Sequence, residues 1–566
     1  MKQSFSLGLS GSNTRETTQR MDTDRFIQRL WSRDVTLWKD DPEHQKIIAR
    51  SLGWLTVPEK LLEEAPELSA FAEEIREDGF THLLVMGMGG SSLCPEVFRR
   101  TFGKIEGYPQ LLVLDSTDPS TLRSLERAVD ISKTLFMVAS KSGTTTEPLM
   151  FYHYFFEKVS EVSAEPGRNF IAITDPGSKL ERLARENGFR RVFQNMADIG
   201  GRYSALSYFG MVPAALMGLD VKEILERAVS AGRVCDANVS AAENPAARLA
   251  AALSQLARQG RNKLTLVIAP PLDSLGLWIE QLIAESTGKE GRGILPVAGE
   301  KLGPPGVYAG DRVFLYIRTE SGASPKIEAD LQALKEAGHP VIDQVLPDLL
   351  SLGSVFFWWE FATALTGALL GINPFDQPNV QESKDNTRQL LEIFREEGRL
   401  PGQEVLVEEQ GCQILGETAS KRETLAGTIR AHLDRVTEGG YVALTAYIPE
   451  TSEHDQLLGA IRLRIRDVLK VATTVGYGPR FLHSTGQLHK GGADNGIFIQ
   501  ITAAESEDLA IPGEPYTFGV LKQAQALGDF QSLAGRHRPV LRFHLGRNVG
   551  VGLKILLDRV SRALMQ

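Results

Sequence analysis

The stretch TLFMVASKSGTTTEPLM, residues 134–150, decides the fold class because it joins a buried strand to the start of a helix. Its apolar half, residues 135–139, is a short continuous run bounded by turn residues, which is typical of a strand buried on both faces. Glu147 and Pro148 stand where the next helix begins, since proline is tolerated in a first helical turn. Hydroxyl side chains therefore fill the turn between the strand and the helix.

This hydroxyl-rich turn is a candidate anion site. The start of a helix leaves backbone N–H groups unpaired and carries partial positive charge, so an anion can dock there and accept further hydrogen bonds from serine and threonine. A phosphate group suits such a turn. The alternative is that the hydroxyls only cap the helix, and the turn taken alone favours that alternative.

The composition is that of a globular protein in a reducing compartment. The 566 residues suffice for three or four domains, and 42% hydrophobic with 23% charged residues argues against extensive disorder. A net charge of −9 disfavours nucleic-acid partners, which require a basic surface. The three cysteines are far apart, so we expect no disulfide framework and a cytoplasmic location.

Two segments are candidates for a targeting or membrane sequence. The first 20 residues are too polar for a secretory signal. Residues 354–372, SVFFWWEFATALTGALLGI, are apolar enough for a span, but Glu360 lies near their middle. A helix that is apolar all round is usual in the centre of a large soluble protein, so we predict a buried helix and no membrane partner.

Short apolar runs alternate with helical patterns along most of the chain, which is typical of βαβ units and parallel sheets. The runs fall at residues 81–89, 110–115, 134–140, 170–174 and 191–195, then at 263–271, 293–298, 312–318 and 339–346. From about residue 400, YVALTAYI, GIFIQIT and VLRFHLG continue the pattern. We predict an α/β protein with two doubly wound parallel sheets in tandem and a C-terminal α/β segment.

A second small-residue turn follows the first predicted strand. In LVMGMGGSSLCPEVF, residues 84–98, the strand passes through three glycines to Ser91 and Ser92. It is not a dinucleotide fingerprint, because Ser92 stands where the third glycine of G-x-G-x-x-G would fall. Since ligands bind outside the carboxyl ends of parallel strands, we expect both turns to face one anion.

Five motifs in order resemble the phosphoglucose isomerase family: GMGGSSL, SKSGTTTEP, GGRYSALS, WIEQLIAESTGKEG and NPFDQPNVQESK. LWKDDPEHQKIIARSLGWLTVP and FLHSTGQLHKGGADNGIFIQIT are more closely similar to the isomerase half of fused transaldolase/phosphoglucose isomerase proteins. No transaldolase activity is predicted. Together with the strand pattern, the resemblance implies a helical extension at 1–60, sugar-isomerase (SIS) domains at 61–220 and 221–400, and a segment at 401–566 that carries a histidine loop.

The resemblance implies an aldose–ketose isomerase that interconverts glucose 6-phosphate and fructose 6-phosphate through ring opening and a cis-enediol. Moving a proton between C1 and C2 requires a base, a group that opens the ring, and donors beside the enediol. No metal or redox cofactor is needed, and we expect none. Two alternatives are open: another sugar-phosphate specificity, such as mannose 6-phosphate, and a sugar-phosphate-binding sensor without turnover.

The family motifs assign the proton-transfer chemistry. Glu285 in ESTGK matches the glutamate that moves the proton, whereas Glu280 and Glu290 do not occupy the matching place. Arg202 in GGRYS matches the arginine that stabilises the enediolate, and a guanidinium suits that role because it stays charged and donates several directed hydrogen bonds.

Ring opening is assigned to a lysine and a histidine. Lys384 matches the family lysine, with Gln377 as a sugar contact, although Gln381 stands where many relatives carry glutamate. The histidine is assigned to His483, with His489 as the second candidate. In relatives the similar motif lies between the glutamate and lysine motifs, whereas here it follows both, but a site is defined by geometry and not by chain order.

The phosphate pattern of the family falls on the two turns. The residues that it assigns to substrate binding there are Gly90, Ser91, Ser140, Lys141, Ser142, Thr144 and Thr145. Binding energy from this non-reacting end would position C1 and C2 against Glu285. Family members often work as dimers, so the resemblance also implies a homodimer.

Overall fold

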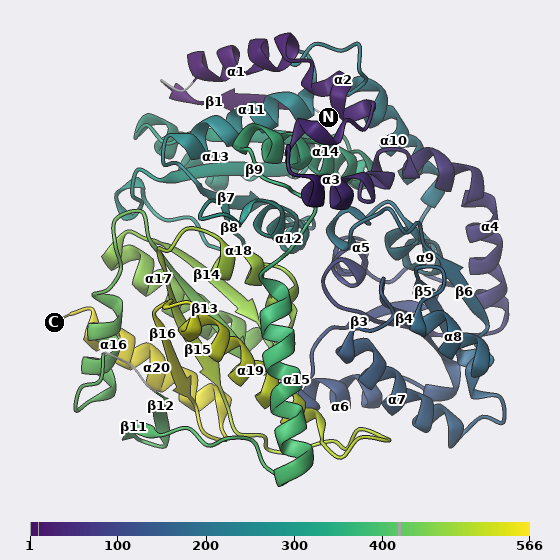
Figure 1. Cartoon of the computed structure of the whole chain (residues 1–566), viewed down its shortest axis with the longest axis vertical. Coiled ribbons are helices and arrows are strands. Elements are labelled where there is room, and N and C mark those ends of the chain that lie inside the picture. Colours follow the sequence, from purple (N-terminus) through teal and green to yellow (C-terminus); the bar gives the residue numbers. More distant parts are fainter. Residues whose placement is uncertain (1, 9–10, 417–419, 566) are drawn as a thin grey trace.

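The computed structural model describes residues 2–8, 11–416 and 420–565. Within these residues, Figure 1 shows three sheets flanked by helices, one for each α/β unit expected from the sequence. The predicted α/β class is confirmed. The domain boundaries at residues 60, 220 and 400 stay a prediction.

The first sheet has the strand order β3-β2-β4-β5-β6, and every pairing is parallel. Its strands are β2 (His82–Met86), β3 (Gln110–Leu114), β4 (Thr134–Ala139), β5 (Phe170–Thr174) and β6 (Arg191–Gln194). The chain runs from β2 to β3 on one side and then crosses to β4 on the other. The order therefore reverses between β2 and β4, which is where open α/β sheets bind their ligands.

Helices cover both faces of the first sheet. They are α4 (Val57–Glu77), α5 (Leu93–Phe102), α6 (Pro119–Ala128), α7 (Thr146–Ser160), α8 (Lys179–Glu186) and α9 (Tyr208–Leu216). Asp118 starts α6 and Ser178 starts α8, each accepting hydrogen bonds from backbone N–H groups of the first turn. Pro148 lies in the first turn of α7, as expected from the sequence.

The second sheet has the order β1-β10-β9-β7-β8. Its parallel strands are β7 (Lys263–Ile268), β8 (Leu295–Val297), β9 (Arg312–Thr319) and β10 (Val341–Leu346). The first 60 residues, expected to be a helical extension, add β1 (Lys2–Ser6), which pairs antiparallel with β10. They also form α1 (Gly11–Thr23), α2 (Phe26–Trp31) and α3 (Pro42–Ala49).

The helices of the second sheet include the apolar segment at residues 354–372, which is apolar enough to be a candidate membrane span. They are α10 (Val221–Val234), α11 (Pro245–Arg258), α12 (Leu275–Thr287), α13 (Pro325–Glu336) and α14 (Leu352–Leu370). Among the described helices, only the stretch Leu349–Leu370 is long and apolar enough to cross a membrane, and 83% of its most apolar window is buried inside the protein. It packs against α10, α11 and α12, and Glu360 is fully buried, so the predicted buried helix is confirmed.

The third sheet has the order β11-β12-β16-β15-β13-β14. Its strands are β11 (Val405–Glu409), β12 (Cys412–Leu415), β13 (Tyr441–Tyr447), β14 (Ala472–Tyr477), β15 (Gly496–Thr502) and β16 (Val540–His544). The pairs β13–β14, β13–β15 and β15–β16 are parallel. β12 is antiparallel to both β11 and β16.

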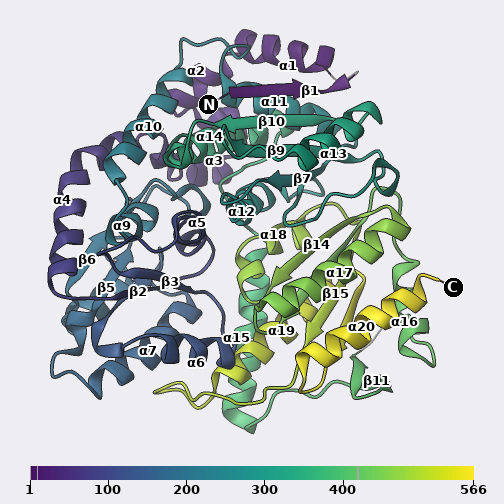
Figure 2. The ribbon, with the colours of Figure 1, turned by 180° about the vertical axis from the view of Figure 1, so that it is seen from behind.

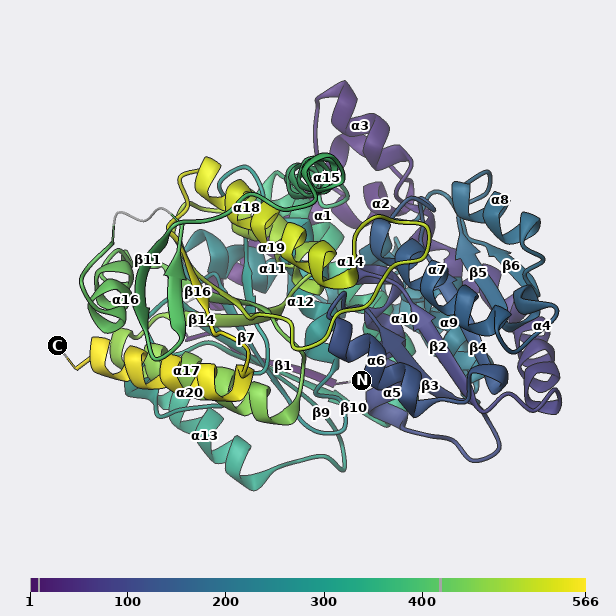
Figure 3. The same ribbon diagram turned by 90° about the horizontal axis from the view of Figure 1, so that it is seen from below.

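Helices also cover both faces of the third sheet. α15 (Val380–Glu397) packs on α19 (Phe518–Gly535) over one face (Figure 1), while α17 (Ser452–Leu469) and α20 (Val549–Ala563) lie on the other (Figure 2). α16 (Leu425–Leu433) packs on α20, and the short α18 (Gly486–Gly491) lies near α12. The view from below shows the loop before α19 reaching the first sheet (Figure 3), where Leu509, Tyr516 and Phe518 share a core with that sheet.

Candidate active site

The two turns predicted to hold an anion lie side by side at the reversal point of the first sheet. Residues 87–92 follow β2, and residues 140–145 follow β4, its hydrogen-bonded neighbour. Ser140 Oγ donates to Thr145 Oγ1 at 3.0 Å, and the hydroxyls of Ser142 and Thr144 are 2.9 Å apart. The expected cluster of hydroxyl groups is therefore present at one edge of the sheet.

The glycine turn after β2 is packed against three other parts of the site. A Cβ at Gly90 would collide with the backbone carbonyl of Gly201, and a Cβ at Gly89 would lie 2.8 Å from Gln281 Nε2 and 2.9 Å from the His483 carbonyl oxygen. Gly89 also has a φ of 55°, which favours glycine. The absence of side chains lets the arginine turn and the histidine loop approach the same point.

Lys141 lies next to the hydroxyl groups but its ammonium is held elsewhere. Its Nζ donates to Asp175 Oδ2 at 2.5 Å and to the carbonyl oxygen of Ala197 at 2.8 Å. Its predicted role at the phosphate stays a prediction, as do those of Gly90, Ser91 and the hydroxyl residues of the second turn.

Glu285 and Arg202 form an ion pair. Arg202 Nη1 lies 3.3 Å from Glu285 Oε1, with the two side chains 3% and 10% exposed. The arginine follows the Gly200–Gly201 turn, and the glutamate lies in the last turn of α12. A carboxylate and a guanidinium at this distance place a proton acceptor beside a permanent positive charge, which is the pair that enediol chemistry requires.

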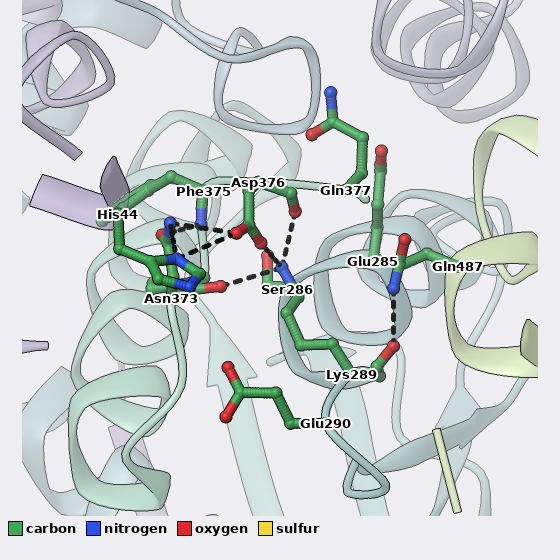
Figure 4. Close-up of polar contacts among 12 residues, drawn as sticks. His44, Glu285, Ser286, Lys289, Glu290, Asn373, Phe375, Asp376, Gln377 and Gln487 are labelled. Carbon is green, nitrogen blue, oxygen red and sulfur yellow. Dashed lines mark hydrogen bonds and ion pairs between the residues drawn. The ribbon is translucent and has the colours of Figure 1, made fainter. Parts of the chain in front are cut away.

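Arg202 also fixes the loop between α14 and α15. Its Nη1 donates to Gln377 Oε1 at 3.0 Å, and its Nη2 donates to the carbonyl oxygens of Pro374 and Asp376 at 2.6 and 2.9 Å. Its Nε donates to Ser286 Oγ at 2.8 Å. Gln377, predicted as a sugar contact, is therefore brought next to Glu285, and Figure 4 shows the polar ends of both side chains on the same side.

Gln281, which the sequence analysis did not select, links Glu285 to the histidine loop. Its Nε2 donates to Glu285 Oε2 at 3.1 Å and to the carbonyl oxygen of His483 at 2.7 Å. Gln281 precedes Glu285 by four residues on α12, so both lie on one helix face. The four-residue spacing from Glu285 was therefore a sequence signal from which Gln281 could have been predicted as a neighbour of that glutamate.

His483 reaches this site from the third sheet, in the short helical turn Arg480–His483 that follows β14. Its Nε2 lies 3.3 Å from Oε1 of Glu147, and its side chain is 13% exposed. Gln525 of α19 donates to the same carboxylate oxygen at 2.7 Å. Glu147 was interpreted only as part of a helix start, and the structure shows it to be the partner of the imidazole.

The electrostatics around Glu147 involve a further predicted residue. Burial raises the pKa of the Glu147 carboxyl, but the charges of His483 and Lys384 and the hydrogen bonds around it hold the pKa below its ordinary value. Lys384 lies on the first turns of α15 with an exposed side chain. The histidine and the lysine assigned to ring opening thus act on one buried carboxylate.

The second histidine candidate lies in a different environment. His489 is buried and packs against the rings of Tyr441, Phe481 and Phe498, with centroid distances of 6.0, 6.3 and 5.1 Å. Burial lowers its pKa to about 3. An imidazole that stays neutral inside an aromatic cluster is suited to packing, so the geometry favours His483.

The two competing glutamates are also separated from the site. Glu280 is buried close to Arg462 and Arg480, and burial raises its pKa to about 7. Glu290 carries an ion pair with Lys39 at 2.8 Å and points away from Glu285 in Figure 4. Glu285 is the glutamate of this group that contacts Arg202.

Lys289 is a second site-supporting residue that the sequence analysis missed. Its buried Nζ donates to the carbonyl oxygens of Asn373 and Asp376 and lies 2.6 Å from Asp376 Oδ1. Burial and the Arg202 charge lower its pKa to about 8. His44 of α3 lies 3.3 Å from Asp376 Oδ2, so the N-terminal segment also supports this loop (Figure 4).

A model of the phosphoglucose isomerase family matches residues 71–293. The chain is 30% identical over 361 residues to the glucose-6-phosphate isomerase of Rubrobacter xylanophilus, which covers 55% of this chain and 83% of that relative. Against the enzyme of the same name from Symbiobacterium thermophilum, the identity is 31% over 389 residues, covering 60% of this chain and 86% of the relative.

Solved structures share the fold. A hypothetical protein from Thermus thermophilus superposes with a TM-score of 0.59 at 24% identity, covering 69% of this chain and 99% of that one. A glucose-6-phosphate isomerase from Chlamydia trachomatis gives a TM-score of 0.52 at 23% identity, covering 69% and 86%. Roughly a third of this chain therefore lies outside each of these matches.

Proposed function

The chain belongs to the phosphoglucose isomerase family, and we propose that its site interconverts glucose 6-phosphate and fructose 6-phosphate. The observation that carries this assignment is the Glu285–Arg202 ion pair beside the two small-residue turns of the first sheet. Such an activity belongs to glycolysis and gluconeogenesis. The chemistry uses proton transfer alone, so no cofactor takes part in the proposed steps.

Phosphate binding comes first in the proposed sequence of events. The hydroxyls of Ser91, Ser140, Ser142, Thr144 and Thr145 and the backbone N–H groups at the start of α7 would bind the 6-phosphate. Gly90 lets the Gly201 turn approach this point, and Lys141, whose ammonium is paired with Asp175, lies next to the hydroxyl groups. Fixing this non-reacting end places the sugar carbons at Glu285, which converts binding energy into orientation.

Ring opening follows at the other end of the sugar. His483 would accept the proton of the O1 hydroxyl while the C1–O5 bond breaks, and Lys384 would donate a proton to O5. Glu147 holds the imidazole in place, because its Oε1 lies 3.3 Å from the imidazole Nε2. Gln525 fixes the carboxylate in turn.

Isomerisation then moves one proton. Glu285 would take the proton from C2 of the open aldose, the C2–H electron pair would form the C1=C2 bond, and the developing negative charge on O1 would be stabilised by Arg202. Transfer of the O2 hydroxyl proton to O1, with return of the first proton from Glu285 to C1 as the C2=O bond forms, yields the ketose. Gln281 orients the carboxylate, and Gln377 would contact a sugar hydroxyl.

A coupled assay on the purified full chain tests this proposal. With fructose 6-phosphate as substrate, glucose 6-phosphate formation is followed through an NADP-linked dehydrogenase, and turnover is expected. Heat-shift stabilisation by fructose 6-phosphate without turnover would favour a sensor and overturn the enzymatic assignment. The same assay with mannose 6-phosphate tests the alternative specificity.

The homodimer and the cytoplasmic location stay proposals that rest on family resemblance and composition. The 3.3 Å contact between His483 and Glu147 within the chain supports a site whose histidine comes from the same subunit. Light scattering of the full chain, combined with activity measured over a dilution series, tests whether dimerisation is needed for turnover.

A further inference from the structure

The third sheet carries polar side chains on one face, although both faces are buried. Its registers place Gln500 beside Arg542 and Thr502 beside both His544 and Tyr447, so these side chains share the face that α19 covers. The other face is apolar, with Leu444, Ile499 and Phe543 in one core cluster. A buried polar face of this kind requires an explanation, because polar groups are costly to bury without partners.

Arg542 on β16 is the residue that packing does not explain. Arg542 is only 7% exposed. Its Nη1 donates a hydrogen bond to Gln403 Oε1 at 2.5 Å. Its Nε is buried without a partner, and no described carboxylate lies within ion-pair distance. Burial lowers the pKa of this guanidinium to about 10, which records the cost of the unpaired charge.

A cavity of about 460 Å³ lies at Arg542. It opens at the carboxyl ends of β13, β15 and β16, where Tyr447, Thr502 and His544 line it together with Arg542. The strand order reverses between β13 and β15, because the chain goes from β13 outward to β14 and then returns to β15 on the other side. The cavity therefore lies where open α/β sheets bind ligands, and its volume suits a small molecule.

The other charged groups of the cavity have partners within the protein, and the Asp508 carboxylate accepts hydrogen bonds from Thr517 Oγ1 and the backbone N–H of Gly519. Lys522 of α19 lies 2.6 Å from Asp118 and 2.7 Å from Glu505, so its ammonium has two carboxylate partners. Leu400, Leu415 and Leu527 form an apolar wall. One unpaired guanidinium beside an apolar wall is complementary to a molecule with one oxyanion group and a small apolar body.

We propose that this cavity of the third sheet is a second ligand site, which binds a small organic anion, a carboxylate or a phosphate monoester, through Arg542. The site is distinct from the proposed active site. α19 stands between the two, since Gln525 of that helix donates to Glu147 whereas Lys522 and Ala526 line the cavity. The proposal does not depend on the isomerase assignment, because it uses none of the residues of that reaction.

Equilibrium dialysis of the full chain tests the proposal with two radiolabelled probes, inorganic phosphate and butyrate. Arg542→Gln is compared with Arg547→Gln, a matched exposed arginine five residues further along, and with Ser140→Ala/Thr145→Ala, which removes phosphate binding at the active site. We expect one probe or both to bind one equivalent that Arg542→Gln weakens at least about tenfold. The exposed-arginine variant and the hydroxyl variant should keep that equivalent.

The preferred probe identifies the ligand as a phosphate or a carboxylate. Unchanged binding of both probes by Arg542→Gln, with the hydroxyl variant losing all phosphate binding, would overturn the proposal. Ala504→Phe provides a second variant if Arg542→Gln does not fold, because it fills the cavity mouth from a partly exposed position and keeps Arg542. It should lose the same equivalent while isomerase turnover is unchanged, and full probe binding by this variant would also contradict the second site.

Discussion

The imidazole Nε2 of His483 lies 3.3 Å from Oε1 of Glu147, so a side chain carried by the third sheet contacts the first turn of α7 in the first sheet's unit. Gln281 of α12 then joins the backbone of His483 to Glu285. The site is therefore assembled from all three α/β units, and the C-terminal segment, which lies outside the family match, supplies one of its groups.

Replacing Glu147 by Gln tests whether this carboxylate positions the imidazole. The amide keeps the size of the side chain but replaces a carboxylate oxygen that contacts the imidazole, so the ring is positioned less well and kcat should fall roughly tenfold to a hundredfold while KM changes little. Steady-state kinetics with fructose 6-phosphate measures both. The matched control is Glu126→Gln, which removes a carboxylate bonded to Tyr154 on the same helix layer and should leave kcat unchanged. Equal losses in the two variants would contradict a specific role for Glu147.

Replacing Glu285 by Gln tests the proton-transfer step itself. Glutamine cannot accept the C2 proton, so turnover should fall at least about a thousandfold, while heat-shift stabilisation by fructose 6-phosphate persists because the phosphate turns are intact. Solvent-tritium exchange into the sugar gives an independent readout of the same step and should vanish. If exchange continues at the wild-type rate, another residue is the base.

The parts of the site that were predictable from sequence are those in which a recognisable motif follows a predicted strand, because the sheet topology then places that motif at a known edge. The turn at residues 140–145 follows a continuous apolar run, and the rule that parallel strands end at one edge predicts that it lies beside residues 87–92. Glu285 and Arg202 came from family motifs. The structure adds that they are in contact, which no pattern in either motif indicates.

Residues that act through long-range packing were not predictable. Glu147 has the sequence context of a helix start, and its partner lies 336 positions away, so only the assembled fold reveals the pair. Lys289 directly follows Gly288, and nothing in the local sequence indicates that its ammonium is buried against Asp376. Strands β1, β11, β12 and β14 were not predicted. β1, β11 and β14 are edge strands whose polar residues interrupt the apolar runs by which strands are recognised, and β12 has only four residues.

Because the pKa of buried Lys289 is lowered to about 8, we expect kcat/KM to decline at alkaline pH, giving the pH profile an alkaline limb. Above a pH of about 8 its ammonium loses its proton, the ion pair with Asp376 disappears, and the loop that carries Gln377 and bonds to Arg202 loosens, so kcat/KM should decline. Lys289→Met should be less active at pH 7 and show no such limb. Lys263→Met is the matched control, because burial also lowers the pKa of Lys263 to about 8 but it lies in β7 away from the site.

Unfolding does not account for that limb. A lysine whose pKa is lower in the folded than in the unfolded chain makes the unfolded chain bind more protons between about pH 8 and 10.5, so its contribution to stability rises with pH there. Circular dichroism across the same range should show an intact fold. An alkaline limb that persists unchanged in Lys289→Met would assign it to another group.

Glu280 predicts a pH-dependent gain in stability when its charge is removed. The residue is 7% exposed and makes no ion pair within 4 Å with any described side chain, and burial raises its pKa to about 7 from an ordinary 4.5, against the lowering effect of Arg462 and Arg480. The folded protein therefore holds this proton to higher pH than the unfolded chain does. Its contribution to stability falls as the pH rises from about 4.5 to 7, and above 7 the full cost of a buried carboxylate remains.

Glu280→Gln should raise the free energy of unfolding at pH 8 by on the order of 1–3 kcal/mol, a gain that shrinks toward zero near pH 5. Thermal unfolding at the two pH values measures the difference, with the exposed Glu290→Gln as the control that should show no such pH dependence. A variant no more stable than wild type at pH 8 would mean that Glu280 is already compensated in the folded protein.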